Sequence, residues 1–186
     1  IDDYIFFHAK QKLPITTLQE LRGSRWFDWM VDDPPHHRAM EIYAEQSRGS
    51  ILVAGLGLGL VFHALERNTQ VQSVTCIEIS QDVIDLMLPN IGALPKTKLV
   101  KDDFYHFFRQ DTQHWDGIIV DLWVATAKTK MDIFYHKVLP TAVELSLKYP
   151  GTPLTFHGFS SISSIQHTSR EILDKIVELN AYGRNP

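Results

Sequence analysis

The sequence has a single cysteine, Cys76, among its 186 residues. No disulfide can form within the chain, and its cysteine content gives no sign of an oxidising compartment. Long apolar runs are also missing: residues 49–65, an apolar stretch without Asp, Glu, Lys or Arg, are too few for a membrane-spanning helix. The leading residues have no signal-peptide pattern, and Ile1 in place of Met suggests a missing or processed start. We therefore expect a cytoplasmic protein without a membrane segment.

An excess of basic residues is absent too. Lys and Arg total 18 against 22 Asp and Glu, which gives a formal net charge of −4. A broad basic surface for nucleic acid is thus disfavoured, and we expect no nucleic-acid partner. Apolar residues make up 44% of the chain and charged residues 22%, a composition typical of a globular domain rather than a disordered chain.

Short apolar runs alternate with longer segments of helical periodicity from residue 49 onward. This pattern is typical of strands joined by helices into a mostly parallel sheet. The expected strands are residues 51–54, 74–79, 98–100, 117–123 and 154–158. We predict an α/β, Rossmann-like, doubly wound domain over residues 49–186.

Two residues predict where helices of this domain begin or break. Ser80 can cap a helix that follows the second strand. Pro140 is expected to divide residues 132–149 into two helices, because an interior proline costs about 3 kcal/mol. A further helix is expected over residues 163–180.

The first 48 residues do not follow this rhythm. Residues 15–20 and 25–31 flank a Gly-Ser turn and predict a β-hairpin. Asp33, followed by two prolines, predicts the start of a helix over about residues 36–46. We interpret residues 1–48 as an N-terminal appendage, a hairpin and a helix packed on the main domain.

Aromatic residues are concentrated in the predicted hairpin. Trp26, Phe27 and Trp29 fall on its second strand. They are expected either to pack the appendage on the main domain or, with Trp123, to cover a binding pocket.

A glycine turn directly follows the first predicted strand. Residues 51–59 read ILVAGLGLG, a buried strand and then a turn with Gly55, Gly57 and Gly59, after which a helix begins. Glycine adopts positive φ at no steric cost and lets a ligand approach the backbone, and a helix N-terminus offers unpaired N–H groups. Glu78 follows by roughly 20 residues at the tip of the next strand, where a carboxylate can accept both hydroxyls of a ribose. These features predict a nucleoside-containing cofactor.

The alternative is a glycine-rich turn that binds nothing, with Glu78 solvated at a strand end. In either case we expect the Glu78 carboxylate to contribute little to core packing.

The spacing of the glycines indicates which cofactor to expect. A dinucleotide fingerprint would place its third glycine at Leu60, so it fits poorly. The observed G-x-G-x-G resembles motif I of the class I S-adenosylmethionine-dependent methyltransferase superfamily. Residues 77–80, IEIS, resemble the ribose-binding motif of those proteins. The resemblance implies S-adenosylmethionine as the cofactor, bound by the three glycines and Glu78.

Residues 99–104, LVKDDF, resemble the third-strand motif of the same superfamily. There an acid receives the adenine amino group and an apolar neighbour packs on the ring. The resemblance implies Asp102 as that acid and Phe104 as the neighbour. Asp103 is the alternative acid, and it could instead cap the following helix.

Two residues at later strand ends are candidates for catalysis. Residues 115–123 resemble the fourth strand of the superfamily, whose terminal acid, here Asp121, faces the transferred group; alternatively Asp121 caps a loop. His157, after the fifth predicted strand, is a second candidate for the base. The adjacent His36 and His37 point in different directions, and no other histidines have ligand spacing, so we expect no metal site.

The glycine motif, the Glu78 motif and the preceding hairpin are most similar to the spermidine synthase-like branch of that superfamily. In aminopropyltransferases a second acid follows the fourth-strand acid by three residues and holds the cationic diamine, but here the position is Val124. Our leading hypothesis is therefore methyl transfer to an unidentified small molecule or side chain. The first alternative is aminopropyl transfer from decarboxylated S-adenosylmethionine, and the second is a non-catalytic nucleoside-binding module of the same fold.

The end of the chain departs from this resemblance. Class I transferases usually finish with an antiparallel strand pair, whereas only residues 181–186 follow the last predicted helix. Either the last strands lie beyond these residues or the sheet is a short variant. A shortened sheet would expose an edge and favour a second copy of the chain as a partner.

Overall fold

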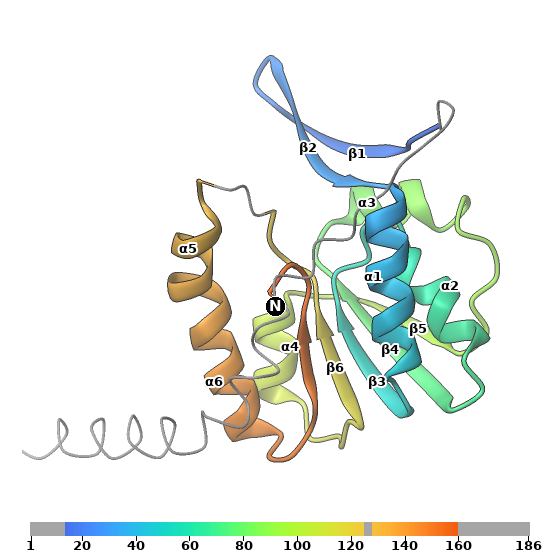
Figure 1. The fold of residues 1–186 in the computed structure, drawn as a ribbon, viewed down its shortest axis with the longest axis vertical. Helices are drawn as coiled ribbons and strands as arrows, with labels where there is room; N and C mark the ends of the chain where they lie inside the picture. Colours follow the sequence, from blue (N-terminus) through green and yellow to red (C-terminus); the bar gives the residue numbers. More distant parts are fainter. Residues whose placement is uncertain (1–13, 125–127, 160–186) are drawn as a thin grey trace, which may run out of the picture.

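The computed structural model describes residues 14–124 and 128–159. Figure 1 shows a layered α/β body with a β-hairpin projecting from one end. The elements in chain order are β1 (Thr17–Arg22), β2 (Arg25–Val31), α1 (Pro34–Glu45), β3 (Gly49–Ala54), α2 (Leu60–Arg67), β4 (Val71–Glu78), α3 (Gln81–Met87), β5 (Thr97–Lys101), α4 (Phe104–Gln110), β6 (Gly117–Val120), α5 (Lys130–Ile133), the π-helix η1 (Phe134–Val138), α6 (Leu139–Lys148) and β7 (Leu154–Phe156).

Five parallel strands form the central sheet in the order β5-β4-β3-β6-β7. The chain starts in the middle at β3, moves to one edge through β4 and β5, and then returns to fill the other side with β6 and β7. The order therefore reverses between β3 and β6, and open α/β sheets bind ligands beyond the strand ends at such a point. The predicted fold class, a Rossmann-like doubly wound sheet with an N-terminal hairpin, is confirmed.

Hydrophobic side chains fill the space on both faces of the sheet. Along β3, Ile51 and Val53 pack on the face covered by α1, α2 and α3, whereas Leu52 and Ala54 pack on the face covered by α4 and α6. All four are fully buried, as expected for a central strand with helices on both sides. Cys76 of β4 is also a core residue.

Helix α1 is part of this core although it belongs to the predicted appendage. Met40 and Ala44 are buried and join the cluster that includes α2 and α3. The predicted Asp33 cap is present, since its carboxylate accepts the His36 N–H at 2.9 Å. The division into residues 1–48 and 49–186 stays a prediction.

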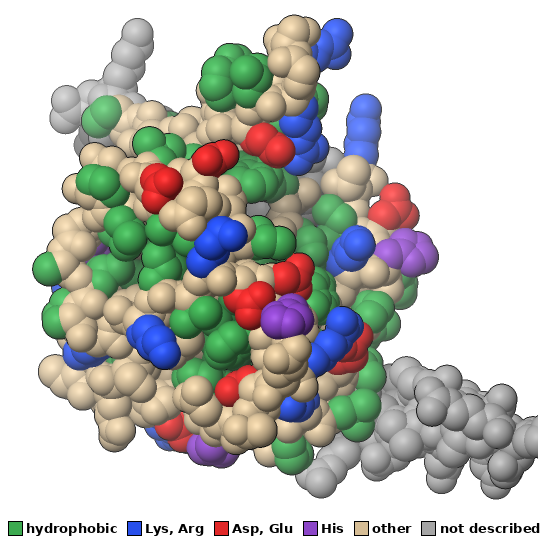
Figure 2. All heavy atoms as spheres, turned by 180° about the vertical axis from the view of Figure 1, so that it is seen from behind, with side chains coloured by type: hydrophobic (Ala, Val, Ile, Leu, Met, Phe, Trp, Pro, Cys, Tyr) green, Lys and Arg blue, Asp and Glu red, His purple; other side chains and the backbone are tan. Residues whose placement is uncertain are grey.

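The hairpin contacts the domain through few side chains. Leu18 of β1 is buried, and Met30 of β2 packs beside the same core cluster. Trp26, Phe27 and Trp29 are 63%, 43% and 37% exposed, so the expectation that they pack the hairpin on the domain is wrong. Hydrophobic side chains are accordingly visible at the hairpin end of the molecule in Figure 2.

Pro140 does not break the helical run that contains it. Helix α5 continues through η1 into α6, and Pro140 lies in the first turn of α6. The proline is accommodated because the π-helical turn before it changes the hydrogen-bonding pattern. The prediction of two separate helices is therefore wrong.

The last predicted helix and the expected lack of a membrane segment remain to be compared with the fold. The helix predicted over residues 163–180 lies outside the described residues. Among the residues that are described, no helix combines the length and the apolar character needed to cross a bilayer.

Candidate functional site

The glycine turn between β3 and α2 depends on close packing by other parts of the chain. Gly55 and Gly59 have φ of 95° and 75°, values that favour glycine. A Cβ on Gly55 would lie 2.5 Å from the backbone oxygen of Asp121, and one on Gly59 would lie 2.7 Å from the Ile91 side chain. Both glycines are thus required by internal contacts, whatever the turn binds.

The middle glycine is covered by the hairpin. Gly57 has φ of 51°, and a Cβ there would lie 2.6 Å from the sulfur of Met30. The same sulfur accepts a hydrogen bond from the Leu58 N–H at 3.2 Å. The sequence analysis missed Met30, because a methionine among exposed aromatics carries no motif.

Glu78 lies against the glycine turn at the end of β4, where the sequence predicts it. Its side chain is only 7% exposed. One carboxylate oxygen accepts the Leu56 N–H at 2.8 Å, and the other accepts the Ser80 N–H at 2.8 Å. The alternative of a solvated strand-end acid is therefore wrong. Each oxygen keeps a second lone pair, so a role toward a ribose stays a prediction.

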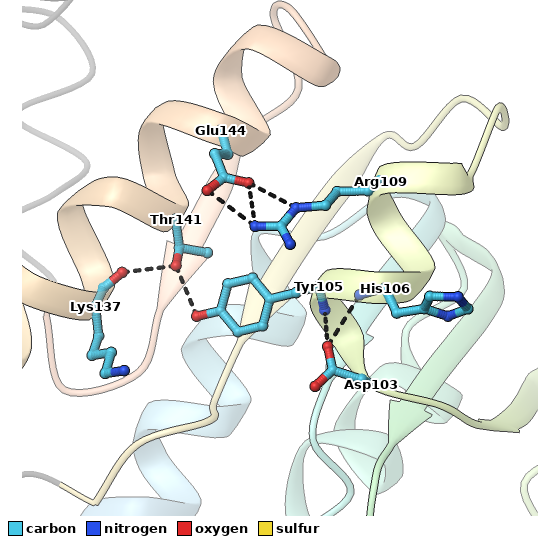
Figure 3. A network of polar contacts seen from close by, with 7 residues as sticks. All are labelled: Asp103, Tyr105, His106, Arg109, Lys137, Thr141 and Glu144. Carbon is cyan, nitrogen blue, oxygen red and sulfur yellow. Dashed lines mark hydrogen bonds and ion pairs between the residues drawn. The ribbon is translucent and has the colours of Figure 1, made fainter.

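The residues after β5 are held by local contacts. Asp103 accepts the N–H groups of Tyr105 and His106 at 2.7 and 3.0 Å and caps α4 (Figure 3). A carboxylate oxygen of Asp102 lies 3.0 Å from His106 Nδ1, and this hydrogen bond lowers the pKa of Asp102. Phe104 is 4% exposed and packs in the core, so little of its ring is accessible. The adenine-binding roles of these three residues stay predictions.

Contacts between α4 and α6 fix the position of this strand end. The Tyr105 hydroxyl lies 3.0 Å from the Thr141 hydroxyl, and Arg109 pairs with Glu144 at 2.9 Å (Figure 3). The ion pair is exposed and contributes little to stability, so the positioning comes mainly from the packed helices.

Asp121 follows β6 directly and lies beside the glycine turn. Its N–H donates to the Ala54 oxygen at 3.0 Å, and its own carbonyl approaches Gly55. Within residues 14–124 and 128–159, no hydrogen bond or ion pair engages its carboxylate. Burial raises the pKa of Asp121, while the nearby His157 and His36 act in the opposite direction. Asp121 is therefore a partly exposed acid at the reversal of the strand order.

His157 follows β7 and is positioned by α1. Its N–H donates to the Val120 oxygen at 2.9 Å, and its Nδ1 lies 3.3 Å from the Tyr43 hydroxyl. Burial lowers the pKa of His157, although the negative charge of Asp121 opposes this effect. The structure thus brings both predicted catalytic residues near each other.

Helix α1 adds a residue to this group that the sequence analysis did not select. The ring centroid of His36 lies 5.2 Å from that of His157, and His36 Nδ1 lies 2.7 Å from an Asp33 oxygen. His37 instead pairs with Asp32, so the adjacent histidines do point in different directions.

The assembled residues define what the site can do. The glycine turn, Glu78, Asp121 and His157 all follow the carboxyl ends of parallel strands, on both sides of the position where the strand order reverses. A buried carboxylate and an N-terminal helix turn suit a polar nucleoside, and an acid beside a histidine suits proton transfer or a cationic ligand.

Comparison with known proteins gives one curated relative. No protein-family model matches the sequence. The chain is 26% identical over 136 residues to the polyamine aminopropyltransferase of Sulfurisphaera tokodaii, an alignment that covers 68% of this chain and 45% of that protein. The chain therefore spans less than half the length of this relative.

Solved structures similar to this chain include transferases of two kinds. Spermidine synthase from Thermotoga maritima is 17% identical with a TM-score of 0.44, over 60% of this chain and 42% of that one. The 23S rRNA methyltransferase ErmE is 16% identical with a TM-score of 0.45, over 67% and 45% of the two chains. These scores are too low to carry an argument, so the fold class depends on the strand order: a Rossmann-like, doubly wound parallel sheet with an N-terminal hairpin.

Proposed function

We propose that this chain transfers an alkyl group from an adenosyl sulfonium donor to an amine. The observation that carries the proposal is the Asp121 carboxylate, which has no hydrogen bond or ion pair within the described residues and lies beside the glycine turn at the reversal of the strand order. A carboxylate there can hold a cationic group close to the donor.

The donor site is formed by the glycine turn and Glu78. Helix α2 begins at Leu60, and its N-cap Gly59 has no side-chain cap. The Phe62 N–H donates to the Gly59 oxygen at 3.2 Å. Within the described residues, the Leu60 and Val61 N–H groups are therefore the ones available to a polar ligand. Glu78 is already oriented by the Leu56 and Ser80 N–H groups, so it can accept ribose hydroxyls without losing side-chain freedom on binding. Alkyl transfer then needs mainly alignment, because the sulfonium carbon is already activated.

Aminopropyl transfer is the first choice for the group that moves. The curated relative is named for this activity and aligns over 68% of the chain. This reverses the order expected from the sequence, in which methyl transfer came first. Methyl transfer remains the second candidate because Val124, 46% exposed, stands where a second carboxylate would hold a diamine.

Incubation with putrescine and either donor separates the two reactions. We expect decarboxylated S-adenosylmethionine to be consumed, with 5′-methylthioadenosine and a longer polyamine as products. Consumption of S-adenosylmethionine alone, with S-adenosylhomocysteine as product, would establish methyl transfer instead. Calorimetry that detects no binding of either donor would refute both.

A pair of variants tests the role of Asp121. Asp121→Asn should lower turnover by roughly 100-fold or more, because the amide lacks the negative charge that holds the cationic group beside the donor. The matched control is Asp85→Asn on the exposed surface of α3, which should keep the wild-type rate. Equal rates for both variants would remove Asp121 from the reaction.

A further inference from the structure

A group of titratable side chains links α1 to the ends of β6 and β7. Its members come from three separate parts of the sequence, and all lie within interaction range of His157. They are Asp33, His36, Tyr43, Asp121 and His157.

The contacts in this group form a continuous series. The Asp33 carboxylate lies 2.7 Å from His36 Nδ1, and the His36 ring lies 5.2 Å from the His157 ring with a tilt of 40°. The Tyr43 hydroxyl fixes the other side of His157, 3.3 Å from its Nδ1. Asp33 therefore orients His36, and α1 as a whole orients His157.

The two ends of the series differ in their exposure. The side chains of His36 and Asp33 are 29% and 30% exposed, so this end reaches solvent. His157 is more enclosed, and burial lowers its pKa, which favours the neutral imidazole that can accept a proton. The charged or titratable groups that act on it are Asp121 after β6, and Asp33 and His36 at the start of α1.

We propose that His157 accepts the proton of an ammonium held by Asp121, and that His36 and Asp33 are positioning residues that hold the His157 ring from α1. The proposal rests on the proposed function and names a step within it. It also assigns α1, rather than the sheet alone, to the reaction site.

The proposed step balances as follows. The ammonium loses one proton to the neutral imidazole of His157, which becomes an imidazolium, and leaves a neutral amine. The amine lone pair forms a bond to the sulfonium carbon, and the carbon–sulfur bond breaks with its electron pair retained by sulfur. The donor leaves as a neutral thioether, and the imidazolium of His157 releases its proton to water.

A structural role is the competing explanation, since the same contacts could simply attach α1 to β7. A structural role would leave kcat and its pH profile unchanged in a folded variant, so turnover as a function of pH distinguishes the two. The titration of His157 tests whether these charged groups lie close to it.

The first experiment follows the histidine ring signals of the whole chain by NMR as a function of pH. Asp121→Asn should shift the His157 titration to lower pH, because a stabilising negative charge is removed. His36→Gln should shift it to higher pH, because a repelling cation is removed. The control His37→Gln removes the adjacent histidine, which pairs with Asp32, and should leave the His157 titration unchanged. Shifts in the same direction, or none, would overturn the proposal.

The second experiment measures turnover of putrescine with each sulfonium donor across the pH range. His157→Gln should lower kcat by roughly 100-fold with little change in donor KM. His36→Gln should move the acidic limb of the profile to higher pH, in the same direction as the NMR shift. Wild-type kcat in His157→Gln would overturn the proposal.

Calorimetry separates failure of this inference from failure of the proposed function. If the wild-type chain binds neither donor, the proposed function fails and this step fails with it. If a donor binds and is turned over equally by the wild type and His157→Gln, only the present inference is refuted.

Discussion

The sulfur of Met30 accepts a hydrogen bond from the Leu58 N–H at 3.2 Å and occupies the space beside Gly57. Met30 is the last residue but one of β2, so the hairpin is attached directly to the turn between β3 and α2. A long, flexible thioether suits this irregular gap. The position of the hairpin and the shape of the glycine turn therefore depend on each other.

Replacement of Gly57 tests this dependence. Gly57→Ala should destabilise the fold by about 2–3 kcal/mol, because the new Cβ lies 2.6 Å from the Met30 sulfur and φ is positive. Urea unfolding measures the change. Gly92→Ala is the matched control: its φ is also positive, but nothing lies within 4 Å of its Cβ, so about 1 kcal/mol is expected.

A double variant separates the steric part of this cost from the backbone part. Gly57→Ala combined with Met30→Ala should cost less than the sum of the two single changes, because the clash is no longer present. Strict additivity would show that Met30 and Gly57 are not in contact in solution.

Glu78 should matter for folding as well as for the donor. Glu78→Ala removes two charge-assisted hydrogen bonds, to Leu56 and Ser80, and should destabilise the chain by about 3 kcal/mol. This corrects the expectation that the side chain contributes little. Glu78→Gln keeps the shape and one acceptor, so it should cost about half as much.

Thermal unfolding and calorimetric donor binding, measured on the same samples, test both roles of Glu78. If Glu78→Gln remains folded and binds either donor as tightly as the wild type, the carboxylate is structural only. If Glu78→Ala is as stable as the wild type, the two backbone contacts are unimportant.

The fold could be predicted largely because its strands are buried on both faces. Ile51 to Ala54 are continuously apolar, and Ser80 caps α3 through the Val83 N–H as predicted. Pro140 could not be placed correctly, since tolerance of proline depends on the π-helical turn that precedes it.

The candidate site was predicted only where it follows strand ends. Glu78, Asp121 and His157 were found because parallel strands bring their carboxyl ends to one edge. Met30 and His36 were missed, because their positions depend on how the hairpin and α1 pack, and no local pattern encodes that packing.

A buried polar network at the start of β6 should affect stability without affecting the site. Asp111, 8% exposed, accepts the Trp115 ring N–H at 2.7 Å and the Tyr149 hydroxyl at 2.8 Å. Asp111→Asn should destabilise the chain by about 2–3 kcal/mol, and Tyr149→Phe by about 1 kcal/mol. Urea unfolding checks both values, and donor binding should be unchanged in the variants while they are folded.

The pH dependence of stability should carry a signature of His157. Its pKa is lowered by burial, so in acid the unfolded chain binds a proton before the folded chain does. The free energy of unfolding should therefore fall as pH decreases from about 6.5, the ordinary value for histidine, to the lowered pKa. His157→Gln should flatten the urea-unfolding profile over this range. An unchanged profile would show that the pKa of His157 is the same in the folded and the unfolded chain.

For Asp121, the change of the unfolding free energy with pH should have the opposite sign, because burial of its ionised carboxylate destabilises the fold. Burial raises its pKa, which means that the folded chain binds the proton more tightly than the unfolded chain. Its contribution to stability is fully present below the ordinary carboxyl pKa and is lost as pH rises to the raised value. Asparagine resembles the neutral form, so Asp121→Asn should be more stable than the wild type at pH 7.

Urea unfolding of both proteins at pH 4 and pH 7 measures this difference. The gain in stability from Asp121→Asn should be larger at pH 7 than at pH 4, because the raised pKa of the wild-type carboxyl costs stability as pH rises above its ordinary value. Combined with loss of turnover, such a result means that the acid is retained for its chemistry rather than for folding. A variant less stable than the wild type at pH 7 would instead show that the Asp121 carboxylate makes a stabilising contact, and would contradict its role as an unpaired acid.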